Sequence, residues 1–283
     1  RCATLRLCRP DSRAMTHDLR LRIAPAISEI PAAQWDALAG PQPFVRHAFL
    51  DALERSGCAQ SHTGWQPRHL TLWRGERLVA ALPLYAKSHS FGEFVFDWAW
   101  AEAWERAGLR YYPKLLTAVP FSPVVGPRLL AADAAARERI LAEAIGLAAT
   151  SGVSSWHILF PSEAEAAVLA HHGLLLREGV QFHWHNAGYG DFEEFLGTLA
   201  RDKRKKIRQE RRRVAEAGVR VRRIDGQEIG KRDWEFFVRC YDHTYHAHRS
   251  IPYLNLAFFE SLGQSMPQHL AMLIAERGGR RIA

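Results

Sequence analysis

The chain has 283 residues, of which 47% are hydrophobic and 24% charged, so it fits one large globular domain or two ordinary ones. No apolar run of about 18 residues occurs, which predicts no membrane-spanning helix. None of the four cysteines forms a C-x-x-C pair, which argues against a disulfide framework or a zinc site and favours a reducing, cytoplasmic setting. The net charge is +8, but residues 201–213 carry +7 and residues 1–14 carry +3, so the remainder is close to neutral.

The first residues lack an apolar core and a small-residue cleavage site, so they do not have the pattern of a secretory signal peptide. The first methionine is Met15. We therefore predict that residues 1–14 are a disordered extension outside the fold.

The first part of the chain predicts helices followed by a hairpin. Apolar spacing predicts helices over residues 28–38 and 44–56. Two strands, 69–73 and 77–85, follow around an Arg-Gly-Glu turn. Next comes an aromatic-rich stretch in which residues 92–98 alternate as in a strand.

The following segment alternates between helix and strand. The alanine-rich residues 131–149 predict a helix, and residues 155–160 predict a buried strand. Ser162 and Glu165 have the spacing of a capping box that opens another helix. With a further strand expected over 177–185, this order predicts an α/β sandwich with a mixed sheet.

A second section begins near Asn186. Its predicted elements are, in order, a long helix over 191–217, a strand over 219–224, helices over 232–248 and 256–262, and a strand over 271–275 with the start of its hairpin partner.

Two parts of the sequence resemble each other. Residues 48–53 are similar to residues 257–262, and Pro-Arg-His-Leu at 67–70 matches Pro-Gln-His-Leu at 267–270, each followed by a predicted hairpin. Chance similarity of two short pieces is the alternative. A true duplication predicts one domain over residues 15–185 and a second over 186–283 that lacks about 100 C-terminal residues. The unfinished hairpin would leave a sheet edge open, so we expect poor solubility.

The order of elements resembles the acyl-CoA N-acyltransferase fold of the Gcn5-related N-acetyltransferases (GNAT), and two such units with a basic helix resemble FemAB-type peptidyl transferases. The sequence resembles the bacterial FemAB-like, peptidoglycan biosynthesis/recognition family. The residues that carry the resemblance are Gly64–Leu70, Leu82–Tyr85, His89–Trp100, Tyr111–Leu115, Pro120–Val124, Gln181–Trp184 and Arg204–Arg211. The resemblance implies an α/β fold of tandem GNAT-like domains with mixed sheets, the second incomplete. It also implies transfer of an acyl or aminoacyl group onto an amine, with a cell-wall precursor as the acceptor.

Amide-forming transfer needs a group that deprotonates the amine. Asp97 lies in an aromatic run, where partial desolvation would raise the pKa of its carboxyl group toward that of a base. Pairing with backbone N–H groups or a lysine is the structural alternative. Trp98 and Trp100, on one face of the expected strand, are candidates for stacking on a sugar or nucleobase, unless they belong to the core.

The strand predicted over 177–185 places His183 and His185 on one face, which we expect to line a cleft with His183 as a second catalytic candidate. No carboxylate or cysteine lies at ligand spacing, so no metal site is predicted. The remaining substrate-binding candidates are Phe121, Ser122 and Trp184 in the motifs above. The resemblance adds Tyr241, Thr244, His248 and Tyr253.

The basic run 201–213 predicts a phosphate-binding helix that uses Lys203, Arg204, Lys205 and Arg208, with a merely solvated helix as the alternative. The phosphate would belong to tRNA or a lipid-linked pyrophosphate, or the helix would rest on an anionic inner-membrane surface. No pyrophosphate loop of the acetyltransferase type occurs in residues 15–283, so acyl-CoA and aminoacyl-tRNA both stay open as donors, and no stable protein partner is indicated. A non-catalytic module that binds RNA or a membrane surface is the competing function.

Overall fold

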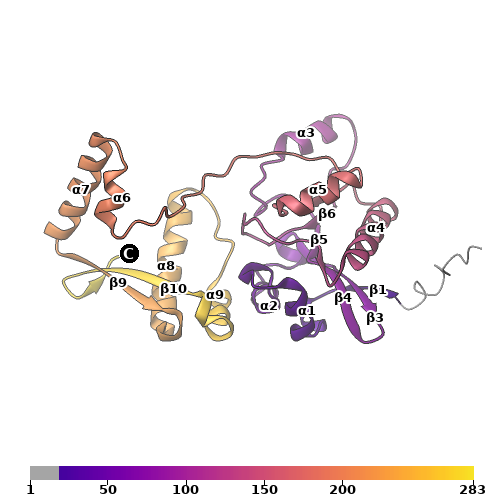
Figure 1. Cartoon of the computed structure of the whole chain (residues 1–283), viewed down its shortest axis with the longest axis horizontal. Helices are drawn as coiled ribbons and strands as arrows, with labels where there is room; N and C mark the ends of the chain where they lie inside the picture. Colours follow the sequence, from indigo (N-terminus) through magenta and orange to yellow (C-terminus); the bar gives the residue numbers. More distant parts are fainter. Residues whose placement is uncertain (1–18) are drawn as a thin grey trace, which may run out of the picture. The chain divides into compact units, whose positions relative to one another are not determined.

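The computed structural model describes residues 19–283, which form two compact units of mixed α/β structure (Figure 1). The first unit runs to His171 and also includes Tyr253–Leu262. The second comprises His172–Pro252 and Gly263–Ala283. The expected extension over residues 1–14 lies outside the described residues.

The first sheet of the first unit is antiparallel, with strand order β1-β3-β4-β7. Its strands are β1 (Leu19–Ala24), β3 (His69–Arg74), β4 (Arg77–Leu82) and β7 (Leu130–Ala131). Helices α1 (Ala32–Ala39) and α4 (Ala134–Thr150) pack on it, and α2 (His47–Arg55) lies beside α1. The core between them holds fully buried apolar side chains such as Trp35, Leu72 and Ile140.

The second sheet of this unit has the order β2-β5-β6-β8, and only its β6–β8 pair is parallel. The strands are β2 (Trp65–Pro67), β5 (Leu84–Lys87), β6 (Lys114–Thr117) and β8 (Trp156–Ile158). Only Pro83 separates β4 from β5, so the chain passes directly from the first sheet into the second. Helix α3 (Trp98–Arg106) lies between β5 and β6 in the sequence, and α5 (Glu163–His171) follows β8.

The second unit is built on a three-stranded antiparallel sheet, β11-β10-β9. Its elements are α6 (Phe192–Gly197), α7 (Arg201–Glu216), β9 (Val219–Asp225), α8 (Lys231–Ala247), β10 (Ala271–Arg277) and β11 (Arg280–Arg281). Helix α9 (Leu256–Ser265) begins in the first unit and ends in the second. Met272 and Ile274 alternate along β10 and are buried, as expected for a sheet with one covered face.

Elements with strong local signals are confirmed. The hairpin is present as β3 and β4, although the second strand predicted over 77–85 is interrupted at Pro83 and continues as β5 of the other sheet. The alanine-rich helix is α4, capped by the Asp133 carboxylate, which accepts the Ala136 N–H. The capping box also forms: Glu165 N–H donates to Ser162 Oγ at 3.3 Å, and Ser162 N–H donates to Glu165 Oε2 at 3.2 Å.

Three predicted elements are wrong. Residues 92–97 are not a strand, because Gly92, Phe94 and Phe96 all have positive φ, which no β ladder accommodates. The strand expected over 177–185 is absent, since residues 174–190 hold no helix or strand and find no pairing partner among the described residues. The long helix over 191–217 is two helices, α6 and α7.

The predicted domain boundary also differs from the observed division. The compact units separate after His171, and Tyr253–Leu262 returns to the first unit. The assignment of GNAT-like domains to residues 15–185 and 186–283 stays a prediction.

Candidate functional site

Two lysines stand directly opposite each other inside the second sheet of the first unit. Lys87 at the end of β5 pairs with Lys114 at the start of β6, and both side chains are fully buried. Like charges directly across two strands repel each other. The pair therefore requires compensating groups, and the segment 88–98, which we call the aromatic loop, supplies them.

Lys114 binds the aromatic loop at three points. Its ammonium group donates to Ser90 Oγ at 2.9 Å, to Glu93 Oε2 at 2.8 Å and to Asp97 Oδ2 at 2.6 Å. These contacts use all three ammonium hydrogens. Tyr111 donates a further hydrogen bond to Asp97 Oδ2 at 2.7 Å. Lys114 of β6 thus holds the loop near its first end through a hydroxyl group and farther along through two buried carboxylates.

The environment of Asp97 differs from the one predicted. Burial by itself would raise the pKa of its carboxyl group, but hydrogen bonds from Lys114, Tyr111 and Ser90 outweigh it and lower the pKa to about 2. The expected raised pKa is therefore wrong, and the lysine-paired alternative holds. A carboxylate of this acidity keeps its charge at neutral pH and is a weak proton acceptor. In Glu93, by contrast, burial dominates and raises the pKa.

Lys87 is a titratable residue that sequence reasoning missed. Its ammonium nitrogen lies 3.7 Å from the centre of the Trp65 ring and donates to the Phe91 carbonyl at 3.3 Å. Burial lowers the pKa of Lys87 to about 7, the neighbouring Lys114 adds to this shift, and Glu93 and Asp97 oppose it. Lys87 therefore changes charge near neutral pH. The available signal was a lysine placed at the end of an otherwise apolar strand.

With Glu93 and Asp97 pointing inward, the aromatic side chains of the loop face outward. Phe96 is 74% exposed, and Trp100, in the first turn of α3, is 58% exposed. Phe94 and Phe96 hold left-handed backbone conformations, which are rare for bulky residues and cluster at functional sites. The correction to the predicted strand places Trp98 and Trp100 on a helix, although both remain accessible for stacking on a ring.

The structure brings together two of the predicted substrate-binding residues. The ring of Phe121 stacks on Tyr253 with centroids 5.1 Å apart and planes 17° apart. Phe94 of the aromatic loop approaches Tyr253 edge-on at 6.4 Å. Phe121 N–H donates to the Gly92 carbonyl at 3.3 Å, and Ser122 comes next in the chain. These residues extend the aromatic surface of the first unit.

The other predicted residues lie in the second unit. His183 is exposed in the segment without regular structure, with Nε2 3.2 Å from Gln181 Oε1, so the expected cleft-facing strand does not position it. Trp184 lines a pocket beside α6. Tyr241 and Thr244 lie on α8, where Thr244 donates to the Cys240 carbonyl, and His248 follows the end of this helix.

The four predicted phosphate ligands divide into two pairs. Arg204 donates to the carbonyls of Gly197 and Leu199, and Arg208 forms an ion pair with Glu193. Lys203 and Lys205 are exposed and have no ion-pair partner among residues 19–283. Of the four predicted ligands, these two lysines are therefore the ones whose charge is available to a phosphate.

The sequence profile of the FemAB-like family, described as peptidoglycan biosynthesis/recognition, matches residues 26–283. The chain belongs to this family. The match covers both units, including the aromatic loop and α7 of this FemAB-like protein.

Other comparisons add context. Among solved structures, a crystal structure of FemX is similar to this FemAB-like chain, with 14% sequence identity and a TM-score of 0.45. The similar region covers 88% of this chain and 57% of the FemX chain, so the chain spans little more than half the length of that relative. Curated proteins yield no significant match. Within residues 19–283, no helix is both long and apolar enough to cross a membrane.

Proposed function

We propose that this FemAB-like protein transfers an acyl or aminoacyl group onto an amine of a peptidoglycan precursor. The observation that carries the proposal is the match to the family over residues 26–283. Tandem GNAT-like halves are the architecture that fits this function. In this proposal the protein meets such precursors in the cytoplasm, at the inner face of the membrane.

The reaction forms one amide bond. The neutral acceptor amine attacks the activated carbonyl carbon, the bond to the donor oxygen or sulfur breaks, and the amine proton passes to that leaving group. Holding the two reactants in line is the main contribution that a protein makes to such a step. The exposed rings of the aromatic loop, with Phe121 and Tyr253, offer a stacking surface for a ring of the acceptor.

The predicted catalytic residues take different roles in this proposal. Asp97 positions the loop, since its Oδ2 is occupied by Lys114 and Tyr111 and its pKa is about 2. His183 is the group to test as a relay that carries the amine proton to the leaving group, because its imidazole is accessible. Aminoacyl-tRNA is favoured over acyl-CoA as the donor, because the exposed cations Lys203 and Lys205 suit a polyanion.

The test is a transfer assay with the full chain. The protein is incubated with charged tRNA or acyl-CoA and with a nucleotide-linked or lipid-linked precursor that carries a free amine. Mass spectrometry should show the precursor heavier by one acyl or aminoacyl group. Trp100→Ala should raise KM for the acceptor about tenfold, whereas Glu102→Ala, on the same helix, should not. If no donor and acceptor pair gives product, the proposal fails.

A second candidate is a binding module without catalysis. The exposed, unpaired Lys203 and Lys205 on α7 favour it, because such cations bind RNA or an anionic membrane surface without any reaction. Replacing both lysines by alanine separates the candidates. A binding module would lose affinity alone, whereas a transferase would also lose turnover with a phosphate-bearing donor.

A further inference from the structure

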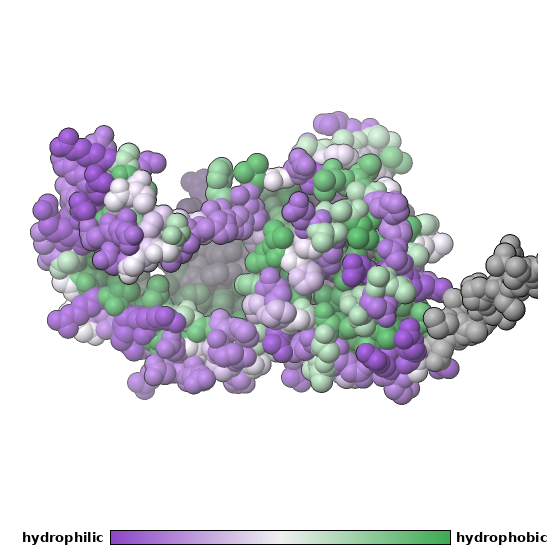
Figure 2. All heavy atoms as spheres, viewed as in Figure 1, coloured by the Kyte–Doolittle hydropathy of each residue, from purple (hydrophilic) through white to green (hydrophobic). Residues whose placement is uncertain are grey.

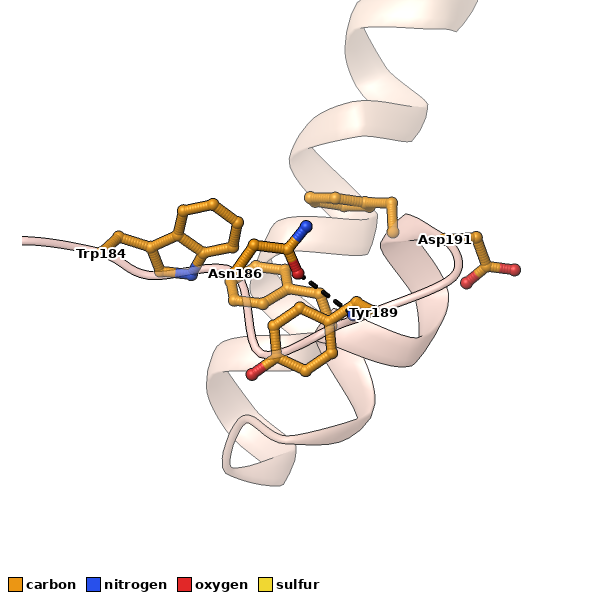
Figure 3. Close-up of a pocket in the computed structure, with 6 residues that line it drawn as sticks. Trp184, Asn186, Tyr189 and Asp191 are labelled. Atoms are coloured by element: carbon orange, nitrogen blue, oxygen red, sulfur yellow. Dashed lines mark hydrogen bonds between the residues drawn. The ribbon is translucent and has the colours of Figure 1, made fainter.

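A pocket of about 480 Å³ in the second unit has no role in the function proposed above. It lies where the segment without regular structure enters α6 (Figure 3). Its lining residues are Trp184, Asn186, Tyr189, Asp191, Phe192 and Phe195. Four of the six are aromatic, so the pocket offers flat faces more than hydrogen-bonding groups.

Contacts among these aromatic rings fix their orientation. Phe195 is central: Trp184 meets it edge-on at 5.8 Å with an interplanar angle of 89°, and Tyr189 meets it at 5.6 Å. Trp184 and Tyr189 are nearly parallel, 28° apart, with centroids separated by 6.4 Å. Trp184 nevertheless remains 65% exposed. A ring held in place at its edge but open on its face is a platform for a planar ligand.

Polar groups at the pocket leave hydrogen-bonding capacity for a ligand. Asn186 Oδ1 accepts the N–H groups of Gly188 and Tyr189 at 3.0 and 3.1 Å, which fixes the turn. The amide nitrogen of Asn186 points away from that turn (Figure 3) and has no partner among residues 19–283. Asp191 Oδ1 caps α6 by accepting the Glu194 N–H at 2.8 Å. A donor and a carboxylate beside flat rings match the edge of a nucleobase.

The pocket is joined to the basic helix. The Arg211 guanidinium of α7 lies 4.3 Å from the centre of the Phe192 ring, which lines the pocket. The ion pair between Arg208 and Glu193 holds α7 against α6. Residues 201–213 carry a net charge of +7, and hydrophilic atoms cover this end of the unit in Figure 2. A planar ligand with phosphates attached therefore suits this site better than a neutral sugar.

We propose that this pocket stacks an unpaired nucleobase of single-stranded RNA, and that Lys203 and Lys205 on α7 contact phosphates of the same strand. Base stacking on aromatic residues beside a cationic track is the general mode of single-strand binding. The inference rests on the proposed function in one respect, since it gives the unpaired end of an aminoacyl-tRNA donor a place on the protein.

Binding of a short fluorescent single-stranded RNA to the full chain, measured by anisotropy, tests the inference. Trp184→Ala should weaken binding about tenfold, and Trp184→Phe should restore most of it. Phe182→Ala is the matched control, because Phe182 is 98% exposed two residues away and does not line the pocket. A blunt RNA duplex should bind the wild type and Trp184→Ala equally. Changing Lys203 and Lys205 to alanine should lower the salt dependence by about 1.4 in the log–log slope.

Equal affinity of Trp184→Ala and wild type for single-stranded RNA overturns the inference. So does quenching of tryptophan fluorescence by an N-acetylglucosamine oligomer and not by RNA, if that quenching is lost in Trp184→Ala, which would indicate a sugar site. RNA binding is measured independently of acyl or aminoacyl transfer, so the two proposals can fail separately. If RNA binds through Trp184 but no precursor is modified, the inference stands and the proposed transferase function fails. If transfer from charged tRNA proceeds unchanged in Trp184→Ala, the transferase function stands and the inference about the pocket fails.

Discussion

Lys114 neutralises two carboxylates that have no access to solvent. Glu93 and Asp97 are each about 2% exposed, and Lys114 is fully buried between them. In Lys114→Met the packing volume is similar, but both carboxylates lose the ammonium group that contacts them directly. We expect this variant to lose about 3–5 kcal/mol of unfolding free energy, because an uncompensated buried charge is strongly unfavourable. Urea unfolding measures the loss.

The charge origin of that loss can be isolated. A variant that combines Lys114→Met with Glu93→Gln and Asp97→Asn keeps the shapes and removes all three charges. It should recover a large part of the stability lost by Lys114→Met alone. Equal destabilisation of the single and triple variants would show that packing, and not charge, is responsible.

Lys87 makes stability depend on pH above neutrality. Burial is the main cause that lowers the pKa of Lys87 to about 7 in the folded protein. Between pH 7 and about 10, the Lys87 amine is therefore protonated in the unfolded chain and mostly neutral in the folded one. The unfolding free energy should therefore rise with pH in this window, with a slope of up to about 1.4 kcal/mol per pH unit. Below pH 7 this contribution to the slope vanishes.

Melting curves from pH 6 to pH 10 provide the measurement. Lys87→Met should flatten the profile, while Lys206→Met, which removes an exposed lysine of α7, should leave its shape unchanged. A profile for Lys87→Met that parallels the wild type would show that Lys87 is charged in the folded state throughout.

At the scale of elements, the path of the aromatic loop depends on Gly92. Its φ is +80°, and a Cβ placed there would come within 2.5 Å of the Phe121 ring. Gly108, after α3, has a similar φ of +72° but open space around the same position. Alanine at either site should cost about 1–2 kcal/mol for the left-handed backbone.

The clash adds to this cost only at Gly92. Gly92→Ala should therefore lose about 1–3 kcal/mol more than Gly108→Ala, because Phe121 is held by its stacking on Tyr253. Chemical denaturation of the two variants compares them directly. Similar losses in both would mean that Phe121 moves aside without penalty.

Elements specified by neighbouring residues could be predicted from the sequence, whereas those that depend on long-range contacts could not. Ser162, Glu165 and the alanine-rich run of α4 lie within a few residues of the structure they specify, so the helices could be predicted. The conformation of the aromatic loop depends on Lys114, which is 17 residues from Asp97 and 21 from Glu93. The alternating pattern of residues 92–98 was therefore misread as a strand.

The candidate site likewise combines residues with a local signal and residues without one. Trp98 and Phe121 lie in aromatic motifs that are visible in the sequence, and Tyr253 came from the resemblance to the family. The position of Lys87 opposite Lys114 depends on the register of β5 and β6, which no local pattern specifies. The break between α6 and α7 was equally hidden, since the residues between Gly197 and Arg201 include neither glycine nor proline.

For the whole molecule, the return of Tyr253–Leu262 to the first unit is the main departure from two consecutive domains. Phe258 is buried and meets Phe49 of α2 edge-on at 5.8 Å, and Asn255 Nδ2 donates to the Ser56 carbonyl at 2.8 Å. These contacts join residues about 200 positions apart in the chain. Residues 15–185 alone would lack them and would expose Phe49.

Limited proteolysis tests this contribution. Residues 174–190 have no regular structure and are largely exposed, so a protease should cut there first. The two fragments should remain associated on gel filtration, because the C-terminal fragment carries Tyr253–Leu262, which packs within the first unit. Tyr253→Ala combined with Phe258→Ala removes three aromatic contacts, with Phe94, Phe121 and Phe49, and should release the fragments after the same cut. Fragments that separate in the wild type would show that this segment contributes little to holding the first unit together.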